Sequence, residues 1–271
     1  MVKPTLLDGS AGTALWAMAE AAGVERAPVW RYNIEHPEFV LKLHRVYVDA
    51  GCEMIQTNTF DANRYTIQRS SDYSVTEVIT AAVELAKQAA NGTDVKVYAS
   101  FGPLPQLMKP YGPITEEEVC DIYAELARVA VDAGVDAIML ETFMDVKMMY
   151  IAAAAAKRFD VPVICSMTFE KHRRTMMGDN VEKIIETLVP LGIDGIGMNC
   201  SLGPVEGLEI MMEYREKTAL PLYFKPNAGM GENYNARQFA NEIAPAIDFV
   251  SYIGGCCGTD AEYIKEIKKL L

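Results

Sequence analysis

The chain has 271 residues, of which 50% are hydrophobic and 23% charged, which is enough apolar material for a large buried core. Its 25 Lys and Arg residues stand against 37 Asp and Glu residues, for a formal net charge of −12, and no stretch gathers the basic residues into a stripe. We therefore expect neither nucleic acid nor an anionic membrane as a partner. No apolar run approaches the roughly 18–20 residues that cross a bilayer, and the N-terminus does not resemble a signal peptide, so we expect a cytoplasmic protein.

Short runs of apolar and β-branched residues alternate along the chain with longer segments of helical pattern. Eight of these runs are expected to form strands, at residues 5–7, 53–56, 96–100, 137–140, 161–168, 195–198, 222–225 and 249–253. Because a helix-like segment follows each run, the pattern predicts parallel βα units. Eight units in a chain of this length are typical of an α/β fold, a single (β/α)8 TIM barrel, which would occupy residues 1–271 as one domain.

Three predicted helices begin with a hydroxyl residue placed three positions before a glutamate. A pair at this spacing can cap the first turn of a helix, because each side chain bonds the other's backbone N–H group. The pairs are Ser74 with Glu77, Thr115 with Glu118, and Thr259 with Glu262.

Three cysteines follow predicted strands. In a (β/α)8 barrel the loops after the strands form one rim, where chemistry takes place. Cys200 follows the sixth predicted strand and Cys256 and Cys257 follow the eighth, so the barrel would bring their thiols together. A disulfide between neighbouring cysteines is strained, whereas a catalytic zinc site commonly takes three protein ligands and leaves a fourth position open. The three cysteines therefore predict a zinc site, although a buried thiol and a simple glycine turn are alternative interpretations of each motif taken alone.

The other three cysteines are expected to be structural. Cys52 falls at a helix–strand junction, Cys120 in a helix and Cys165 within a strand. Free cysteine is among the most frequently buried residue types, so these positions need no chemical role. Six cysteines at irregular spacing also do not resemble the disulfide framework of a small secreted domain.

An all-thiolate zinc site indicates the class of substrate. Three thiolates leave the complex with a net charge of −1 and make the metal a weak Lewis acid toward water. A thiol bound in the open position loses its proton at neutral pH, whereas a free thiol with a pKa of about 8.5 is mostly protonated. The bound thiolate is a nucleophile that can accept an alkyl group.

These motifs resemble the homocysteine S-methyltransferase family of zinc-dependent (β/α)8 barrels. The resemblance is closest to the branch represented by the N-terminal homocysteine-binding domain of cobalamin-dependent methionine synthase. It covers nearly the whole chain, in the family's order, through the segments DGSAGT, EHPEFVLKLHRVYVDAGCEMIQTNTF, SFGP, GVDAIMLETF, TF, GMNCSLGP, KPNAG and GGCCGT. The resemblance implies a methyltransferase that forms methionine from L-homocysteine.

The resemblance also implies a set of zinc ligands. Cys200, Cys256 and Cys257 would bind Zn²⁺, and the homocysteine sulfur would be the fourth ligand. Asn227 would fill the open position when no substrate is bound. The zinc ion would then be the means by which the three cysteines act in catalysis.

For the substrate, the resemblance implies that Asp8 and Glu141 hold the ammonium group and that backbone N–H groups of the turn containing Gly9 and Ala11 receive the carboxylate. Paired carboxylates select a cation, and a glycine-rich turn offers donors to an anion. On the residues alone, a turn-forming role for Asp8 and a lysine or arginine partner for Glu141 are alternative interpretations.

Asn199 is included among the substrate-site residues. Like Asn58, it carries an amide that we expect to satisfy neighbouring groups of the rim rather than to contact substrate directly. Two segments depart from the family pattern: Ser10 and Ala11 stand where Ala-Met is usual, and residues 171–179, KHRRTMMGD, are more basic. These departures affect the part of the rim that would face the methyl donor.

The donor is the open part of this prediction. The chain ends at residue 271, which leaves no room for the further domains of methionine synthase, so we expect methylcobalamin carried by a separate corrinoid protein that docks over the rim. S-methylmethionine or betaine as a small-molecule donor is the alternative within the class. An inactive zinc-binding component of a larger complex, and a zinc hydrolase, are alternatives outside it. The hydrolase is disfavoured because His or carboxylate ligands and a poised base are not evident. The oligomeric state is not predicted.

Overall fold

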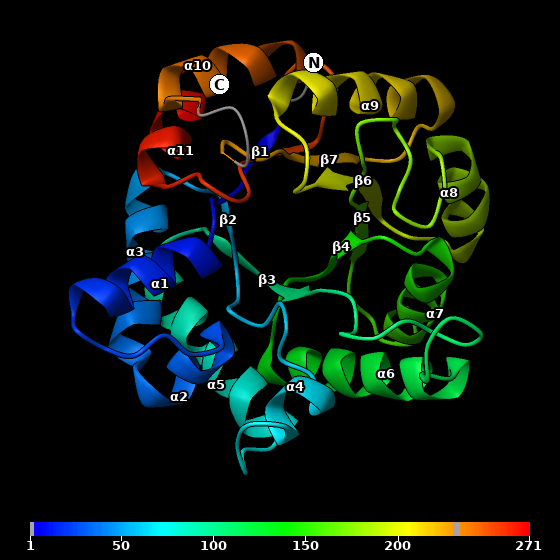
Figure 1. Cartoon of the computed structure of the whole chain (residues 1–271). Coiled ribbons are helices and arrows are strands. Elements are labelled where there is room, and N and C mark those ends of the chain that lie inside the picture. Colours follow the sequence, from blue (N-terminus) through cyan, green and yellow to red (C-terminus); the bar gives the residue numbers. More distant parts are fainter. Residues whose placement is uncertain (1–2, 230–233) are drawn as a thin grey trace.

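The computed structural model describes residues 3–229 and 234–271 and forms a ring of parallel strands surrounded by helices (Figure 1). The strands are β1 (Thr5–Leu6), β2 (Met54–Gln56), β3 (Lys96–Phe101), β4 (Ala137–Phe143), β5 (Val163–Met167), β6 (Gly195–Asn199), β7 (Leu222–Lys225) and β8 (Tyr252–Ile253). They pair in the order β1-β8-β7-β6-β5-β4-β3-β2, and a parallel bridge between Leu7 and Met54 joins the two ends. The predicted single (β/α)8 TIM barrel is confirmed.

The eight strands lie where the apolar runs predict them, with differences at their ends. β4 continues to Phe143, so Glu141 lies within the strand rather than in the loop after it. β5 and β8 are shorter than predicted, and β8 consists of Tyr252–Ile253 alone. Strand ends in a barrel depend on where the neighbouring strand stops pairing, which the sequence of one strand does not determine.

Helices form the outer ring of the barrel (Figure 1). They are α1 (Gly12–Ala21), α2 (Tyr32–Glu35), α3 (Pro37–Ala50), α4 (Arg64–Gln68), α5 (Val75–Ala90), α6 (Glu116–Ala133), α7 (Val146–Ala156), α8 (Val181–Leu188), α9 (Pro204–Lys217), α10 (Ala236–Ile243) and α11 (Ala261–Lys268). Short 3₁₀ helices lie at Val29–Arg31, Val189–Leu191 and Ala244–Ala246. No helix in the described ranges combines the length and the apolar character needed to cross a bilayer.

Two of the three predicted helix caps are confirmed. Ser74 and Thr115 each form a complete capping box at the start of α5 and α6. The third prediction is wrong, because α11 begins at Ala261 and its cap is Asp260, which accepts a hydrogen bond from the Glu262 N–H group. The Thr259 hydroxyl instead donates a hydrogen bond to the Cys256 carbonyl in the preceding loop.

Side chains alternate along each strand between the barrel interior and the layer under the helices. A small interior cluster contains Leu7, Met54, Tyr98, Ala137, Met139, Ile164 and Tyr223, while the residues between them belong to the larger core. Because the strand period is two, the residues two positions beyond an interior side chain also face inward. This places Ser100, Glu141 and Lys225 in a polar layer above the cluster, at the C-terminal end of the barrel.

Candidate active site at the C-terminal end of the barrel

Three thiols meet at the C-terminal end of the barrel. The Sγ atoms of Cys200, Cys256 and Cys257 lie within 4.8 Å of one another, and those of Cys200 and Cys257 are 3.8 Å apart. Two sulfur atoms at Zn–S distances of about 2.3 Å and a tetrahedral angle are also about 3.8 Å apart. The three half-buried side chains therefore form a cluster that can hold a metal ion, and their thiolate chemistry fits zinc.

The pKa values of the clustered thiols differ. Hydrogen bonds from Cys256 and Cys257 lower the pKa of the Cys200 thiol to about 3. The contact with Cys200, together with burial, raises the pKa of Cys257 to about 11, although the contact with Cys256 lowers it. One thiolate is thus stabilised by its two neighbours, which matches the ligand form that a metal requires.

Asn227 lies beside this cluster. Its side chain is buried, its amide contacts Cys200, and its Oδ1 accepts a hydrogen bond from the Cys257 N–H group at 3.1 Å. Asn227 Oδ1, the atom that would bind a metal, therefore accepts a hydrogen bond from the loop that carries Cys257. The predicted role of Asn227 as a zinc ligand stays a prediction.

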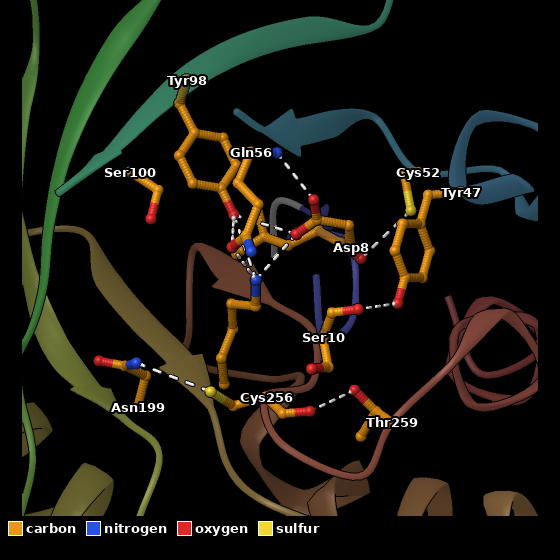
Figure 2. A network of polar contacts seen from close by, with 12 residues as sticks. Asp8, Ser10, Tyr47, Cys52, Gln56, Tyr98, Ser100, Asn199, Cys256 and Thr259 are labelled. Atoms are coloured by element: carbon orange, nitrogen blue, oxygen red, sulfur yellow. Dashed lines mark hydrogen bonds and ion pairs between the residues drawn. The ribbon is translucent and has the colours of Figure 1, made fainter. Parts of the chain in front are cut away.

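The loop that carries Cys256 is fastened by Thr259. The Thr259 hydroxyl donates to the Cys256 carbonyl at 2.7 Å, and the Thr259 N–H group donates to the same oxygen at 3.1 Å (Figure 2). A Cβ atom at Gly255 would lie only 2.5 Å from Thr259 Cγ2. The glycine before the paired cysteines is therefore required by close packing against Thr259.

A cavity of about 390 Å³ opens next to the thiols. Its wall includes the three cysteines, Glu141, Lys225 and the turn at residues 9–13. The cavity thus combines sulfur, a carboxylate, an ammonium group and a helix start.

Glu141 is buried on the cavity wall. Ser100 Oγ donates to its Oε1, and Asn199 Nδ2 donates to its Oε2 at 3.2 Å. Burial raises the pKa of Glu141 above its ordinary value, although the charge of Lys225 opposes this. Asn199 lies behind Glu141 and also accepts from the Ser166 hydroxyl and the Thr142 N–H group. Asn199 therefore positions the carboxylate rather than forming the wall.

Asp8 is also buried and is paired with Lys225. Its Oδ1 lies 2.8 Å from Lys225 Nζ and accepts from the Tyr98 hydroxyl at 3.0 Å, and its Oδ2 accepts from the Gln56 N–H group at 2.7 Å (Figure 2). Burial disfavours the ammonium of Lys225, but the charges of Asp8 and Glu141 raise its pKa above the ordinary value.

The sequence did not lead us to predict that Lys225, Tyr98 and Gln56 belong to this site. A usable signal was present for Lys225, which is the charged residue of an otherwise apolar strand and stands two positions after Tyr223. The alternative interpretation of Glu141 was a lysine or arginine partner, whereas Lys225 forms its ion pair with Asp8.

The turn that contains Gly9 and Ala11 leads into α1 at the edge of the cavity. The Ser10 N–H group donates to the Thr259 carbonyl, and Tyr47 donates its hydroxyl to the Ser10 carbonyl at 2.8 Å. Ala11 precedes α1 without a side-chain cap. The Thr13 N–H group donates to Ser10 Oγ at 3.4 Å, and residues 9–13 line the cavity. The positive dipole end of α1 therefore borders a cavity that can take an anion.

The remaining predicted residues have structural positions. Asn58 donates to the Val29 carbonyl at 2.7 Å and to Asn33 Oδ1 at 2.9 Å, and so fixes the loop around it as predicted. Cys52, Cys120 and Cys165 lie outside the thiol cluster, at the positions predicted for them.

The sequence model of the family described as homocysteine S-methyltransferase matches residues 5–271. The chain belongs to the homocysteine S-methyltransferase family. This confirms the resemblance seen in the cysteine, DGSAGT and PNAG segments and places the protein in a family of enzymes.

Two curated relatives and one solved protein are similar to this chain. Methionine synthases of Mycobacterium leprae (strain TN) and Mycobacterium tuberculosis (strain ATCC 25618 / H37Rv) are each 29% identical to the chain over an alignment of 265 residues that covers 87% of this chain. The match covers 21% and 22% of those proteins, so the chain spans about a fifth of the length of these curated relatives. The homocysteine methyltransferase MmuM of Escherichia coli has the same fold, with a TM-score of 0.82 for its metallated form at 21% identity, covering 98% of this chain and 96% of that one. Its apo form gives 0.78.

Proposed function

We propose that the protein transfers a methyl group to the thiolate of L-homocysteine, forming methionine, at a zinc ion held by Cys200, Cys256 and Cys257. The observation that carries this proposal is the group of three thiols within 4.8 Å of one another on the wall of a cavity. Zinc held there would bind the substrate thiol and lower its pKa, so that the sulfur is deprotonated at neutral pH. Membership of the homocysteine S-methyltransferase family supports the same reaction.

The cavity has a counterpart for each charged end of an amino acid. Glu141, held by Ser100 and Asn199, would receive the ammonium group. The N–H groups at Ala11 and the start of α1 would receive the carboxylate, where the helix dipole favours an anion. Asp8 is paired with Lys225 and is not among the described residues that line the cavity. The substrate would then lie with its sulfur toward the cysteines.

In the reaction the substrate thiol releases its proton to solvent. A sulfur lone pair forms the bond to the methyl carbon while the bond between that carbon and the donor breaks, and the bonding electrons leave with the donor. The loop that Thr259 fastens would hold Cys256, and with it the bound thiolate, in a fixed position, and such positioning lowers the barrier to attack. No side chain is required as a general base, which agrees with the position of His44, the buried histidine, in α3.

We propose methylcobalamin on a separate corrinoid protein as the donor, because the motifs resemble the cobalamin-dependent branch. S-methylmethionine or betaine remains the alternative donor. Residues 1–271 would act as one homocysteine-binding domain. A cluster of reduced thiols also favours a cytoplasmic location, where thiols are kept reduced.

The test combines metal content with turnover. Purified protein is analysed for zinc and then assayed for methionine formation from homocysteine, with methylcobalamin and S-methylmethionine as separate donors. We expect about one zinc per chain, turnover with one donor, and loss of both properties in Cys256→Ala. Cys120→Ala is the matched control because Cys120 lies outside the cluster. A protein that takes up no zinc would contradict the proposal, and zinc without turnover on either donor would favour a binding component.

A further inference from the structure

Lys225 is a buried cation in the wall of the cavity. It follows Tyr223 by two positions on β7, faces the barrel interior and is 1% exposed. Its Nζ lies 2.8 Å from Asp8 Oδ1, 2.9 Å from Gln56 Oε1 and 3.2 Å from the Tyr98 hydroxyl. An ammonium group has three protons to donate, so these three acceptors satisfy Lys225 completely.

Asp8 is correspondingly occupied. Its Oδ1 accepts from both Lys225 and Tyr98, and its Oδ2 accepts from the Gln56 N–H group. The adjacent ammonium neutralises the carboxylate in a place with little water. A second ammonium brought to Asp8 by a substrate would meet the like charge of Lys225 at short range, where screening is weak.

Glu141 differs from Asp8 in its surroundings. Among the described residues, its hydrogen-bond donors are the Ser100 hydroxyl and the Asn199 amide, and both are neutral. Glu141 also lines the cavity directly. The charge of Lys225 also acts on Glu141, but among the described residues Lys225 forms its ion pair with Asp8 and not with Glu141. Glu141 is therefore a carboxylate in the cavity wall that has no cation in direct contact.

We propose that Lys225 determines substrate specificity by occupying Asp8, so that Glu141 alone recognises the ammonium group of a thiol substrate. The inference rests on the proposed function and specifies its acceptor class. A substrate that lacks the ammonium group loses less binding free energy when one carboxylate, rather than two, would have bound that group. The acceptors would be small mercaptocarboxylates held by sulfur and carboxylate, with homocysteine preferred only modestly over the analogue without an amino group.

The test compares the affinities of two thiols for the zinc-loaded chain by calorimetry, without any methyl donor. The thiols are homocysteine and 4-mercaptobutyrate, which is homocysteine without its amino group. We expect the unmodified protein to prefer homocysteine by about tenfold, the effect of one ion pair. Lys225→Met frees Asp8, so we expect the preference to rise to about a hundredfold or more. Lys157→Met is the matched control, because Lys157 pairs with Asp194 away from the cavity and its loss should leave the preference unchanged.

A second variant keeps the test informative if Lys225→Met does not fold. Glu141→Gln removes the charge that is proposed to recognise the ammonium group, and we expect the two thiols then to bind about equally. The ratio of affinities would not respond to a merely structural defect. A preference of about tenfold or more that survives in Glu141→Gln, or an unchanged ratio in Lys225→Met, would overturn the role of Lys225. Failure of both thiols to bind the zinc-loaded protein would overturn the proposed function as well.

Discussion

The Nδ2 atom of Asn199 lies 3.2 Å from Oε2 of Glu141 and 3.8 Å from the Sγ atom of Cys256. One amide on β6 therefore contacts both the carboxylate of β4 and the thiol cluster, and Figure 2 shows its contact with Cys256. Its other end accepts from the N–H group of Thr142, a residue held at the left-handed φ of 63°. Asn199 thus fixes the distance between the proposed ammonium site and the proposed metal.

Replacing Asn199 with alanine should loosen the arrangement of the proposed ammonium site relative to the proposed metal site. We expect Asn199→Ala to weaken homocysteine binding about tenfold, because Glu141 loses one of its two hydrogen-bond donors. The free energy of unfolding should fall by about 1–3 kcal/mol, since the Ser166 hydroxyl and the Thr142 N–H group lose a buried acceptor. Calorimetric binding and urea denaturation measure the two effects.

Asn180→Ala is the control for this variant. Asn180 caps α8, so its loss should cost about 1 kcal/mol of stability without changing the affinity for homocysteine. Unchanged affinity in Asn199→Ala would show that Asn199 does not position Glu141.

The contact between Thr259 and the Cys256 carbonyl should matter for metal affinity. We expect Thr259→Val to weaken zinc binding by about 10–100-fold, because groups that orient ligands typically have effects of this size. Gly255→Ala should have a similar effect through its clash with Thr259. Competition with a zinc-binding dye measures the affinity. Thr187→Val is the control, since its hydroxyl bonds the Lys183 carbonyl on an exposed helix, and equal zinc affinity in all three variants would contradict the prediction.

Zinc should stabilise the fold through the thiol cluster. A ligand at a hundred times its Kd adds about 2.7 kcal/mol to the free energy of unfolding when it binds the native state alone. We expect this gain for the unmodified protein and for Cys120→Ala, and its loss in Cys257→Ala. Denaturation with zinc and with a chelator measures the difference. A gain that persists in Cys257→Ala would place the metal elsewhere.

His44 should make stability depend on pH. It lies buried in α3, and its Nε2 has no hydrogen-bond partner among the described residues. Burial lowers its pKa from 6.5 to about 4, while Asp8 opposes this to a smaller extent. The unfolded chain therefore binds a proton at His44 before the native protein does, so its contribution is complete above the unfolded pKa and is lost as the pH falls from about 6.5 to about 4.

Between pH 7 and pH 5 this difference amounts to about 2 kcal/mol in the free energy of unfolding. We expect His44→Phe to lack that part of the pH dependence, whatever its stability at pH 7. Urea denaturation of both metal-free proteins at the two pH values measures it. Equal losses in the two proteins would show that His44 titrates normally in the native state.

The positions of the strands and the proximity of the three thiols could be predicted from the sequence alone. In parallel βα units every strand ends at the same rim, so Cys200 and Cys256 must approach each other once the eight units are recognised. The caps at Ser74 and Thr115 were equally predictable because they depend on residues three positions apart. The cap predicted at Thr259 was wrong because the Thr259 hydroxyl bonds the Cys256 carbonyl, three positions earlier in the chain, and Asp260 caps α11 instead.

The sequence by itself therefore determined the barrel, the rim and the sulfur cluster, which follow from local periodicity and from the order of the elements. The pairing of Asp8 with Lys225, which are 217 positions apart, was decided only by the tertiary structure. Strand tilt and register place these two side chains in the same interior layer, and no local pattern encodes that neighbourhood. Because Lys225 is paired with Asp8, the Glu141 carboxylate remains available to a cation in the cavity.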